Sequence, residues 1–161
     1  MAIQLRSTKG LHTNGVKLLV YGQAGAGKTS LIKTLPNPVI LSAEGGLLSI
    51  ADSDLPYIEV NDMASLTDAY QWVMGSDEAK QFDSIALDSI SEIAEVVLSA
   101  EKKKTKDPRQ AYGALQEQMG DLIRDFRDIP GKHVYFSAKL EKSQDEMGRI
   151  LYAPGMPGNK T

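Results

Sequence analysis

One short segment limits the possible folds of this chain more than any other. Residues 22–29 read GQAGAGKT, a full match to the pattern G-x-x-x-x-G-K-[ST]. The segment follows the apolar run Val16–Tyr21 and precedes residues that can start a helix. A strand, a glycine-rich turn and a helix in this order predict a phosphate-binding P-loop at the carboxyl edge of a parallel sheet.

The glycines and the polar residues of this segment have separate predicted roles. Gly22, Gly25 and Gly27 allow backbone N–H groups to turn inward around phosphate oxygens. We expect Lys28 to reach the β- and γ-phosphates of a nucleoside triphosphate, most simply ATP, and the hydroxyl of Thr29 to bind Mg²⁺. The alternative, a glycine-rich turn with an accidental lysine, leaves the match at every fixed position unexplained. The predicted cradle consists of Gly22, Gln23, Ala24, Gly25, Ala26, Gly27, Lys28, Thr29 and Ser30.

The rest of the chain predicts an α/β fold, because short apolar runs alternate with segments of helical period. That pattern is typical of a mostly parallel sheet with helices on both faces. Ser65 followed by Asp68 predicts a capping box at the start of the first long helix. The 161 residues predict one domain. Expected strands are residues 16–21, 39–42, 84–87 and 133–137, with weaker candidates at 57–60 and 150–152, and apolar helical faces run through 66–74, 90–98 and 115–126.

The composition excludes several classes of protein. The chain has no cysteine, which excludes disulfides, Cys-ligated zinc and iron–sulfur clusters. Its formal net charge of -3 excludes a global basic field, so a nucleic acid would have to bind a local cluster of cations. No apolar stretch is long enough for a signal peptide or a transmembrane helix, and we expect a cytoplasmic protein with no membrane partner.

Acidic residues at strand ends predict how a bound triphosphate would be hydrolysed. Hydrolysis needs a carboxylate near Mg²⁺ and a group that orients the attacking water. Asp88 ends the apolar run SIALD, where a buried carboxylate is costly without a cation, so we predict that it holds Mg²⁺; a helix N-cap is the alternative. Glu44 ends the run PVILSAE and is the predicted activator of water, with Glu92 as its rival and a solvated glutamate as the alternative for either.

The motifs GQAGAGKT, LSAEGG, IALDS and YFSAK, in this order, resemble those of RecA-like ATPases, and among these the compact phage-encoded Sak-type ATP-binding or single-strand annealing proteins. The resemblance runs from about Val16 to the end of the chain. It implies that Glu44 activates water, that Asp88 binds Mg²⁺, and that Lys139, which follows Ser137, lies where RecA-like proteins sense the γ-phosphate. A solvent-exposed lysine is the alternative for Lys139.

The same resemblance carries expectations about the whole protein. It implies a homo-oligomer, and the host cytoplasm as location if the protein is phage-encoded. RecA-like cores continue with further strands, so the chain is expected to be a core truncated at its C-terminal end.

Two segments resemble the mobile DNA-binding loops of such proteins. Residues 101–113 read EKKKTKDPRQAYG, and their cations would bind the phosphates of single-stranded DNA while Tyr112 stacks on bases. The alternative is a solvated basic helix end. Residues 153–161 read APGMPGNKT and are either a second loop or a frayed terminus. The predicted DNA contacts are Lys102, Lys103, Lys104, Lys106, Arg109 and Tyr112.

The leading hypothesis is therefore a DNA-stimulated ATPase that acts on single-stranded DNA in phage recombination or annealing. One alternative is a nucleotide or small-molecule kinase, for which Arg149 is the only candidate lid residue. Another is a non-catalytic, nucleotide-gated binding module. A GTPase is discounted, because SAK at Ser137 precedes Asn159, the reverse of the order in GTPases, and no D-x-x-G pattern begins at Asp88.

Overall fold

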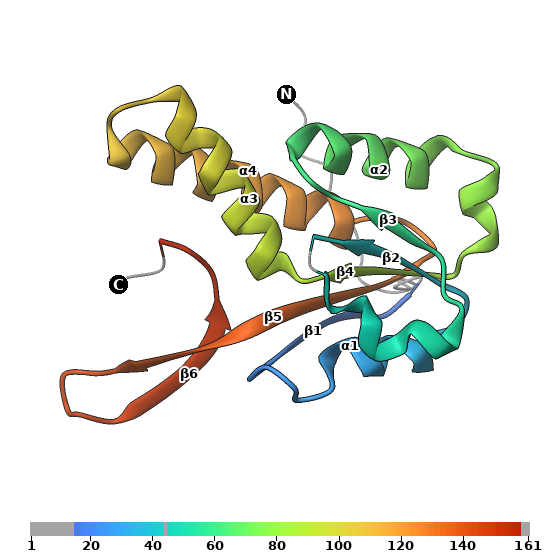
Figure 1. Ribbon diagram of the computed structural model, residues 1–161, viewed down its shortest axis with the longest axis horizontal. Helices are drawn as coiled ribbons and strands as arrows, with labels where there is room; N and C mark the ends of the chain where they lie inside the picture. Colours follow the sequence, from blue (N-terminus) through green and yellow to red (C-terminus); the bar gives the residue numbers. More distant parts are fainter. Residues whose placement is uncertain (1–14, 44, 159–161) are drawn as a thin grey trace, which may run out of the picture.

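The computed structural model describes residues 15–43 and 45–158 of the chain (Figure 1). Within these residues the strands are β1 (Lys17–Gly22), β2 (Pro38–Ser42), β3 (Tyr57–Glu59), β4 (Ser84–Asp88), β5 (His133–Gln144) and β6 (Ile150–Gly155). The α-helices are α1 (Lys28–Leu31), α2 (Met63–Gly75), α3 (Ile90–Lys104) and α4 (Pro108–Arg127). Shorter 3₁₀ segments are η1 (Ile32–Thr34), η2 (Gly45–Ser53) and η3 (Glu78–Gln81).

The strands form one mostly parallel sheet in the order β1-β5-β4-β2-β3. All pairs along this path are parallel, and only β6 pairs antiparallel, with β5. The carboxyl ends of β1 to β5 therefore meet at one edge of the sheet, where open α/β sheets bind their ligands. The predicted α/β P-loop fold is confirmed.

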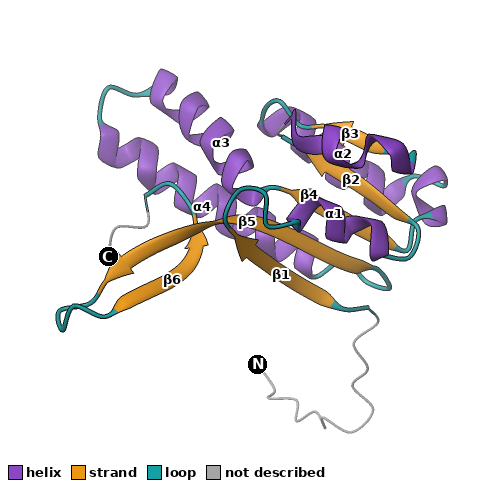
Figure 2. Ribbon diagram, turned by 60° about the horizontal axis from the view of Figure 1, so that its bottom comes forward, coloured by secondary structure: helices purple, strands orange, loops and turns teal. Residues whose placement is uncertain are grey.

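Helices cover both faces of the sheet, as the sequence predicted (Figure 2). Successive strand residues point to opposite faces, so each buried strand contributes to two cores. On one face α2, α3 and α4 pack over a large core, whose strand residues include Val39, Leu41, Ile85, Leu87, Val134 and Phe136. On the other face α1, η1 and η2 cover a smaller core of Ile32, Ile40, Ile50, Ala86 and Tyr135.

Strand β5 is longer than predicted. The expected strand ended at Ser137, but β5 continues to Gln144, and β6 pairs with this extension from Ile150 to Gly155. The predicted loop from residue 153 is therefore partly strand, and its last residues, 159–161, lie outside the described part of the chain. The extension is mostly polar, so its own sequence does not predict a strand. Its backbone groups are satisfied by the partner strand β6, which follows only after a turn.

Helix α2 begins earlier than predicted. The side chain of Asp62 accepts a hydrogen bond from the backbone N–H of Ser65 at 2.7 Å, and the Ser65 hydroxyl accepts one from the Asp62 N–H at 3.1 Å. The capping box is thus Asp62 with Ser65, and the predicted pair of Ser65 with Asp68 is wrong by one helical turn. Met63 packs against the large core, which fixes the start of the helix at that residue.

The basic segment 101–113 is mostly helical and not a loop. Helix α3 continues to Lys104 and α4 begins at Pro108, so only residues 105–107 connect them. Asp107 caps α4 by accepting a hydrogen bond from the Arg109 N–H at 2.9 Å, and proline in the first turn favours the same start. No helix among the described residues is long and apolar enough to cross a membrane.

Candidate nucleotide-binding site

The P-loop joins β1 to α1 in a conformation that needs glycine at two positions. Gly25 has φ 77° and Gly27 has φ 86°, both in the left-handed region. Gly27 is the N-cap of α1, so its conformation turns the chain directly into the helix. The loop is closed by a hydrogen bond of 3.2 Å from the Ala26 N–H to the Gln23 carbonyl. These contacts point the N-terminus of α1 at the space enclosed by the loop.

Lys28 is held from two sides. Its Nζ donates to the carbonyl oxygens of Gly22 and Gln23, each at 2.9 Å. Its own carbonyl accepts a hydrogen bond of 2.8 Å from the hydroxyl of Tyr135. Burial, and then the negative charge of Asp88, raises the pKa of Tyr135 to about 12, so this hydroxyl stays a donor. Sequence reasoning missed Tyr135, because it looks like one more apolar residue of a buried strand.

The predicted Mg²⁺ ligands lie next to each other. Thr29 Oγ1 donates to Asp88 Oδ2 at 2.8 Å, and Ser137 Oγ donates to Asp88 Oδ1. Asp88 is only 5% exposed, at the end of β4. Ser89, not Asp88, caps α3 by accepting from the Glu92 N–H at 3.3 Å. A hydroxyl and a carboxylate in contact are the oxygen donors that Mg²⁺ prefers, so the residues fit this cation.

The P-loop and the strand ends enclose a cavity of about 440 Å³. Most of the predicted cradle faces the cavity. Gly22, Gln23 and Ala26 belong to the loop but do not line the cavity. Gly46 and Ser49 of η2 were not predicted; the glycine pair after Glu44 was the only available signal for them. The lining residues are Ala24, Gly25, Gly27, Lys28, Thr29, Ser30, Gly46, Ser49, Asp88, Ser89 and Lys139.

Lys139 stands at the edge of this cavity and is bound on two sides. Its Nζ forms an ion pair with Glu92, the residue predicted as the rival activator of water. Its backbone N–H donates to Ser91 Oγ at 2.9 Å, and Ser91 Oγ donates to the Gly155 carbonyl at 2.5 Å. Ser91, which is buried, therefore connects the edge of the cavity to the end of β6; sequence reasoning missed it.

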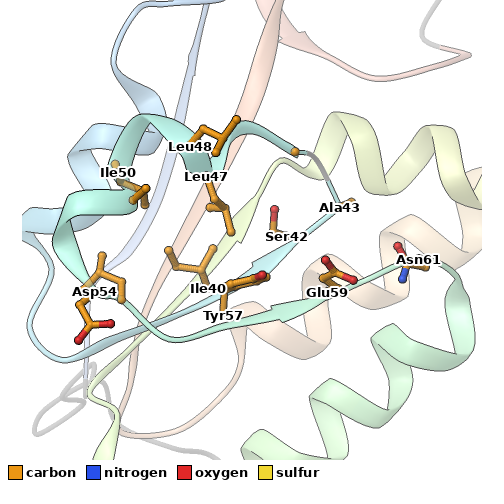
Figure 3. Close-up of a pocket in the computed structure, with 13 residues that line it drawn as sticks. Ile40, Ser42, Ala43, Leu47, Leu48, Ile50, Asp54, Tyr57, Glu59 and Asn61 are labelled. Carbon is orange, nitrogen blue, oxygen red and sulfur yellow. The ribbon is translucent and has the colours of Figure 1, made fainter.

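Glu44 lies outside the described residues. The Ala43 N–H donates to the Asp88 carbonyl at 3.3 Å, and Gly46, two residues after Glu44, lines the nucleotide cavity, whereas Ala43 and Gly45 line a separate cavity beside β3 (Figure 3).

The last turn of α3 and the short connection to α4 carry the predicted DNA-binding lysines, whose surroundings differ. Lys104 forms an ion pair of 2.6 Å with the buried carboxylate of Glu101. Lys103, Lys106 and Arg109 are exposed, as are Lys102 and Lys104. Because α3 starts beside Asp88 and spans 15 residues, this turn lies about 20 Å from the nucleotide cavity.

Tyr112, the residue predicted to stack on bases, has only part of its side chain at the surface. Tyr112 is half-buried against the large core, and Lys102 Nζ lies 5.5 Å from the centre of its ring. Gly158 approaches the ring so closely that a Cβ there would lie 2.9 Å from Tyr112 Cδ1. The ring therefore packs between α4 and Gly158. The interpretation of residues 101–113 as a loop did not predict this contact.

The chain is similar to known proteins at the level of a family model and of a solved structure. A family model described as an AAA domain matches residues 14–155, that is, the whole sheet from β1 to β6. Among solved structures, a KaiC-like protein from the hyperthermophilic archaeon Pyrococcus horikoshii OT3 is similar with a TM-score of 0.48 and 14% identity, over 90% of this chain and 81% of that chain. No curated protein matches the chain significantly.

Proposed function

Because the chain belongs to the AAA domain family of P-loop ATPases, we propose that it binds ATP with Mg²⁺ and hydrolyses it to ADP and phosphate. The observation that carries the proposal is the contact of 2.8 Å between Thr29 and Asp88 inside the P-loop cavity. This contact places a predicted metal ligand of the loop against a buried carboxylate of a different strand, beside Lys28. A glycine-rich turn without a nucleotide function would not need that arrangement.

The residues in and around the cavity have separate tasks in this mechanism. The backbone N–H groups of the P-loop and the Lys28 ammonium bind the β- and γ-phosphates. Thr29 and Asp88 would hold Mg²⁺, which, when bound, neutralises charge that develops on the phosphate oxygens. Ser137 orients the Asp88 carboxylate. Tyr135 holds the first turn of α1 in place through the Lys28 carbonyl.

For activation of the attacking water we propose Glu44. Support comes from Ala43, whose N–H donates to the Asp88 carbonyl, and from Gly46, two residues after Glu44, which lines the nucleotide cavity. The rival, Glu92, already forms an ion pair with the Lys139 ammonium, which occupies one of its carboxylate oxygens. Glu92 therefore serves better as the partner that positions Lys139 near the γ-phosphate than as a base.

For the partner of this ATPase we propose single-stranded DNA, bound at the turn between α3 and α4, as in the Sak-type proteins that the motifs resemble. Support comes from Lys103, Lys106 and Arg109, which are exposed together in a chain of net charge -3. The kinase alternative is less favoured, since Arg149 Nε donates to Asp145 Oδ2 at 2.7 Å within the β5–β6 turn. A stimulation of hydrolysis by DNA would act along α3, which begins beside Asp88.

Phosphate release by purified variants tests the ATPase. We expect Glu44→Gln to bind ATP normally and to lose about 100-fold or more of the turnover rate, because the amide keeps the size of the side chain but accepts no proton. Glu92→Gln should retain most of the activity, and Lys28→Ala serves as the binding-deficient control. If Glu92→Gln abolishes hydrolysis while Glu44→Gln does not, the assignment of the base is wrong; if the wild type releases no phosphate with or without DNA, the ATPase proposal fails.

A further inference from the structure

The first turn of α3 holds Lys139 at the edge of the nucleotide cavity through two neighbouring residues. Glu92 forms an ion pair with the Lys139 ammonium, and the buried hydroxyl of Ser91 accepts a hydrogen bond of 2.9 Å from the Lys139 backbone N–H. The cap of the helix is a different residue, Ser89, which accepts from the Glu92 N–H. The hydrogen bonds of the Ser91 hydroxyl therefore lead from α3 to the sheet.

Ser91 lies where β5 changes its neighbour in the sheet. The pairing of β5 with β4 ends at Phe136, and its pairing with β6 begins at Lys139. Because Lys139 also pairs with Gly22 of β1, β6 takes the side of β5 that β4 leaves. At this junction the Ser91 hydroxyl accepts from the Lys139 N–H and donates to the Gly155 carbonyl at 2.5 Å. It thus satisfies two backbone groups where the strand exchanges one partner for another.

The backbone of β5 directs Lys139 to the nucleotide side of the sheet. Side chains alternate along a strand, so Tyr135, Ser137 and Lys139 share one face. On that face Tyr135 contacts the backbone of Lys28, and Ser137 donates to the carboxylate of Asp88. Lys139 lies two residues further along the strand, about 7 Å beyond Ser137. We therefore expect its ammonium to contact the γ-phosphate, which a triphosphate has and a diphosphate lacks.

The position of this ammonium depends on how firmly the Lys139 backbone is held. A lysine ammonium stands at the end of a flexible four-carbon stem. The Lys139 side chain is 57% exposed, so packing fixes little of it. Without the Ser91 hydroxyl, the Lys139 N–H and the Gly155 carbonyl would both lose their partner, and such groups move until they find another. The ammonium would then no longer be held in one place.

We propose that Ser91 is a positioning residue for Lys139, and that through Lys139 it gives the site a preference for a nucleoside triphosphate over a diphosphate. Lys139 lines the nucleotide cavity and Ser91 does not, so Ser91 acts without touching the nucleotide. The proposal rests on the proposed binding of ATP in this cavity. ADP keeps every phosphate of ATP except the last, so a preference for ATP has to come from a group at the outer end of the cavity.

A purely structural Ser91 has a different experimental signature. If its hydroxyl only stabilised the junction of β5, β4 and β6, removing it would weaken the binding of triphosphate and diphosphate alike, or of neither. A positioning residue for Lys139 instead changes the affinity for the triphosphate alone. Affinities for the two nucleotides, measured on the same variant, therefore separate the two roles.

Calorimetric titration with Mg²⁺ and a slowly hydrolysed ATP analogue, and separately with Mg²⁺ and ADP, tests the proposal. We expect Ser91→Ala to weaken binding of the analogue about 10-fold and to leave binding of ADP unchanged. Lys139→Ala should do the same. The double variant should lose no more than Lys139→Ala alone, because Ser91 acts through that lysine.

Ser84→Ala is the matched control. Ser84 is also a buried serine, and its hydroxyl donates to the Pro36 carbonyl at 2.7 Å, at the start of β4 and so at the other end of the strand from Asp88. This variant should bind both nucleotides like the wild type.

Ser91→Cys keeps the test decisive if the alanine variant does not fold. A thiol fills nearly the same space and is a weak donor and acceptor, so this variant should also lose affinity for the analogue and keep its affinity for ADP. Equal losses for both nucleotides, or a double variant that loses more than Lys139→Ala, would overturn the proposal. So would a wild type that binds both nucleotides equally well, which would leave the ATPase intact.

Failure of the proposed function gives a different result. A wild type that binds the analogue more tightly than ADP but releases no phosphate from ATP would contradict the ATPase and leave the role of Ser91 open to the same titrations. A wild type that binds neither nucleotide would overturn both proposals.

Discussion

The carboxylate of Asp88 accepts hydrogen bonds from side chains on two other elements, Thr29 from α1 and Ser137 from β5. A buried carboxylate is costly unless its oxygens are satisfied, and here each oxygen has its own donor. The residues that carry the chemistry are therefore positioned by their neighbours as well as by their own strands. Tyr135 extends this arrangement to the backbone of the P-loop.

The hydrogen bond from Tyr135 to the Lys28 carbonyl can be tested by a single substitution. The change Tyr135→Phe keeps the packing of the ring and removes the donor to the Lys28 carbonyl, so the free energy of unfolding should fall by about 1 kcal/mol. In the wild type the pKa of Tyr135 is raised by burial from 10.0 to about 12, so the unfolded chain ionises first and stability is lost as the pH rises through this window. The phenylalanine variant lacks that loss. Urea denaturation below and above pH 10 measures both effects; equal stability of the two proteins at neutral pH would contradict the role of this hydrogen bond.

At the scale of the elements, the packing of α3 against α4 determines which cations are available to bind DNA. Their antiparallel packing buries Glu101, which binds Lys104 and Gln118, so that Lys104 stays exposed but has its charge paired. Lys102 lies over the Tyr112 ring. A run of basic residues that is uniform in sequence is thus divided by packing into paired and unpaired cations.

The DNA prediction follows from that division. Replacing Lys103, Lys106 and Arg109 with alanine should weaken binding to single-stranded DNA and reduce the slope of log affinity against log salt by about 2, because each lost phosphate contact contributes about 0.7. Replacing Lys104 alone should change the slope less, since its charge is already neutralised. Fluorescence anisotropy of a labelled oligonucleotide over a salt series measures the slopes. Equal slopes for the wild type and the triple variant would leave this turn as a solvated helix end.

For the whole molecule, the nucleotide cavity joins elements from both faces and several strands of the sheet. A ligand bound only by the folded state adds about 2.7 kcal/mol of stability at 100 times its dissociation constant. For a chain of this size that corresponds to a rise of about 5 to 10 °C in melting temperature. We expect Mg²⁺ and ATP to produce this shift in the wild type and in Lys33→Ala, a nearby lysine of η1 that does not line the cavity, but not in Lys28→Ala. A thermal-shift assay decides; an unchanged shift in the Lys28 variant would contradict the role of its ammonium.

Local sequence patterns were sufficient to predict the P-loop, the α/β class and the position of Asp88 as a buried carboxylate at the end of a strand. The conformation of a P-loop depends on glycines a few residues apart, and the end of a buried strand is visible in its apolar run, so both are properties of short segments. The boundaries of α2 and α4 were less accurate, because each N-cap is chosen by which following residue packs into the core.

Only the tertiary structure decided the contacts between distant residues. Tyr135 and Lys28 are 107 positions apart, Ser91 and Gly155 are 64 apart, and the pairing of Lys142 with Tyr152 exists only because β6 returns along β5. Whether such groups meet depends on how the sheet and its helices pack as a whole and not on the propensity of either segment. No short window of sequence therefore predicts these contacts. For the same reason the two-stranded ribbon that β5 and β6 form beyond Lys139 became visible only in three dimensions.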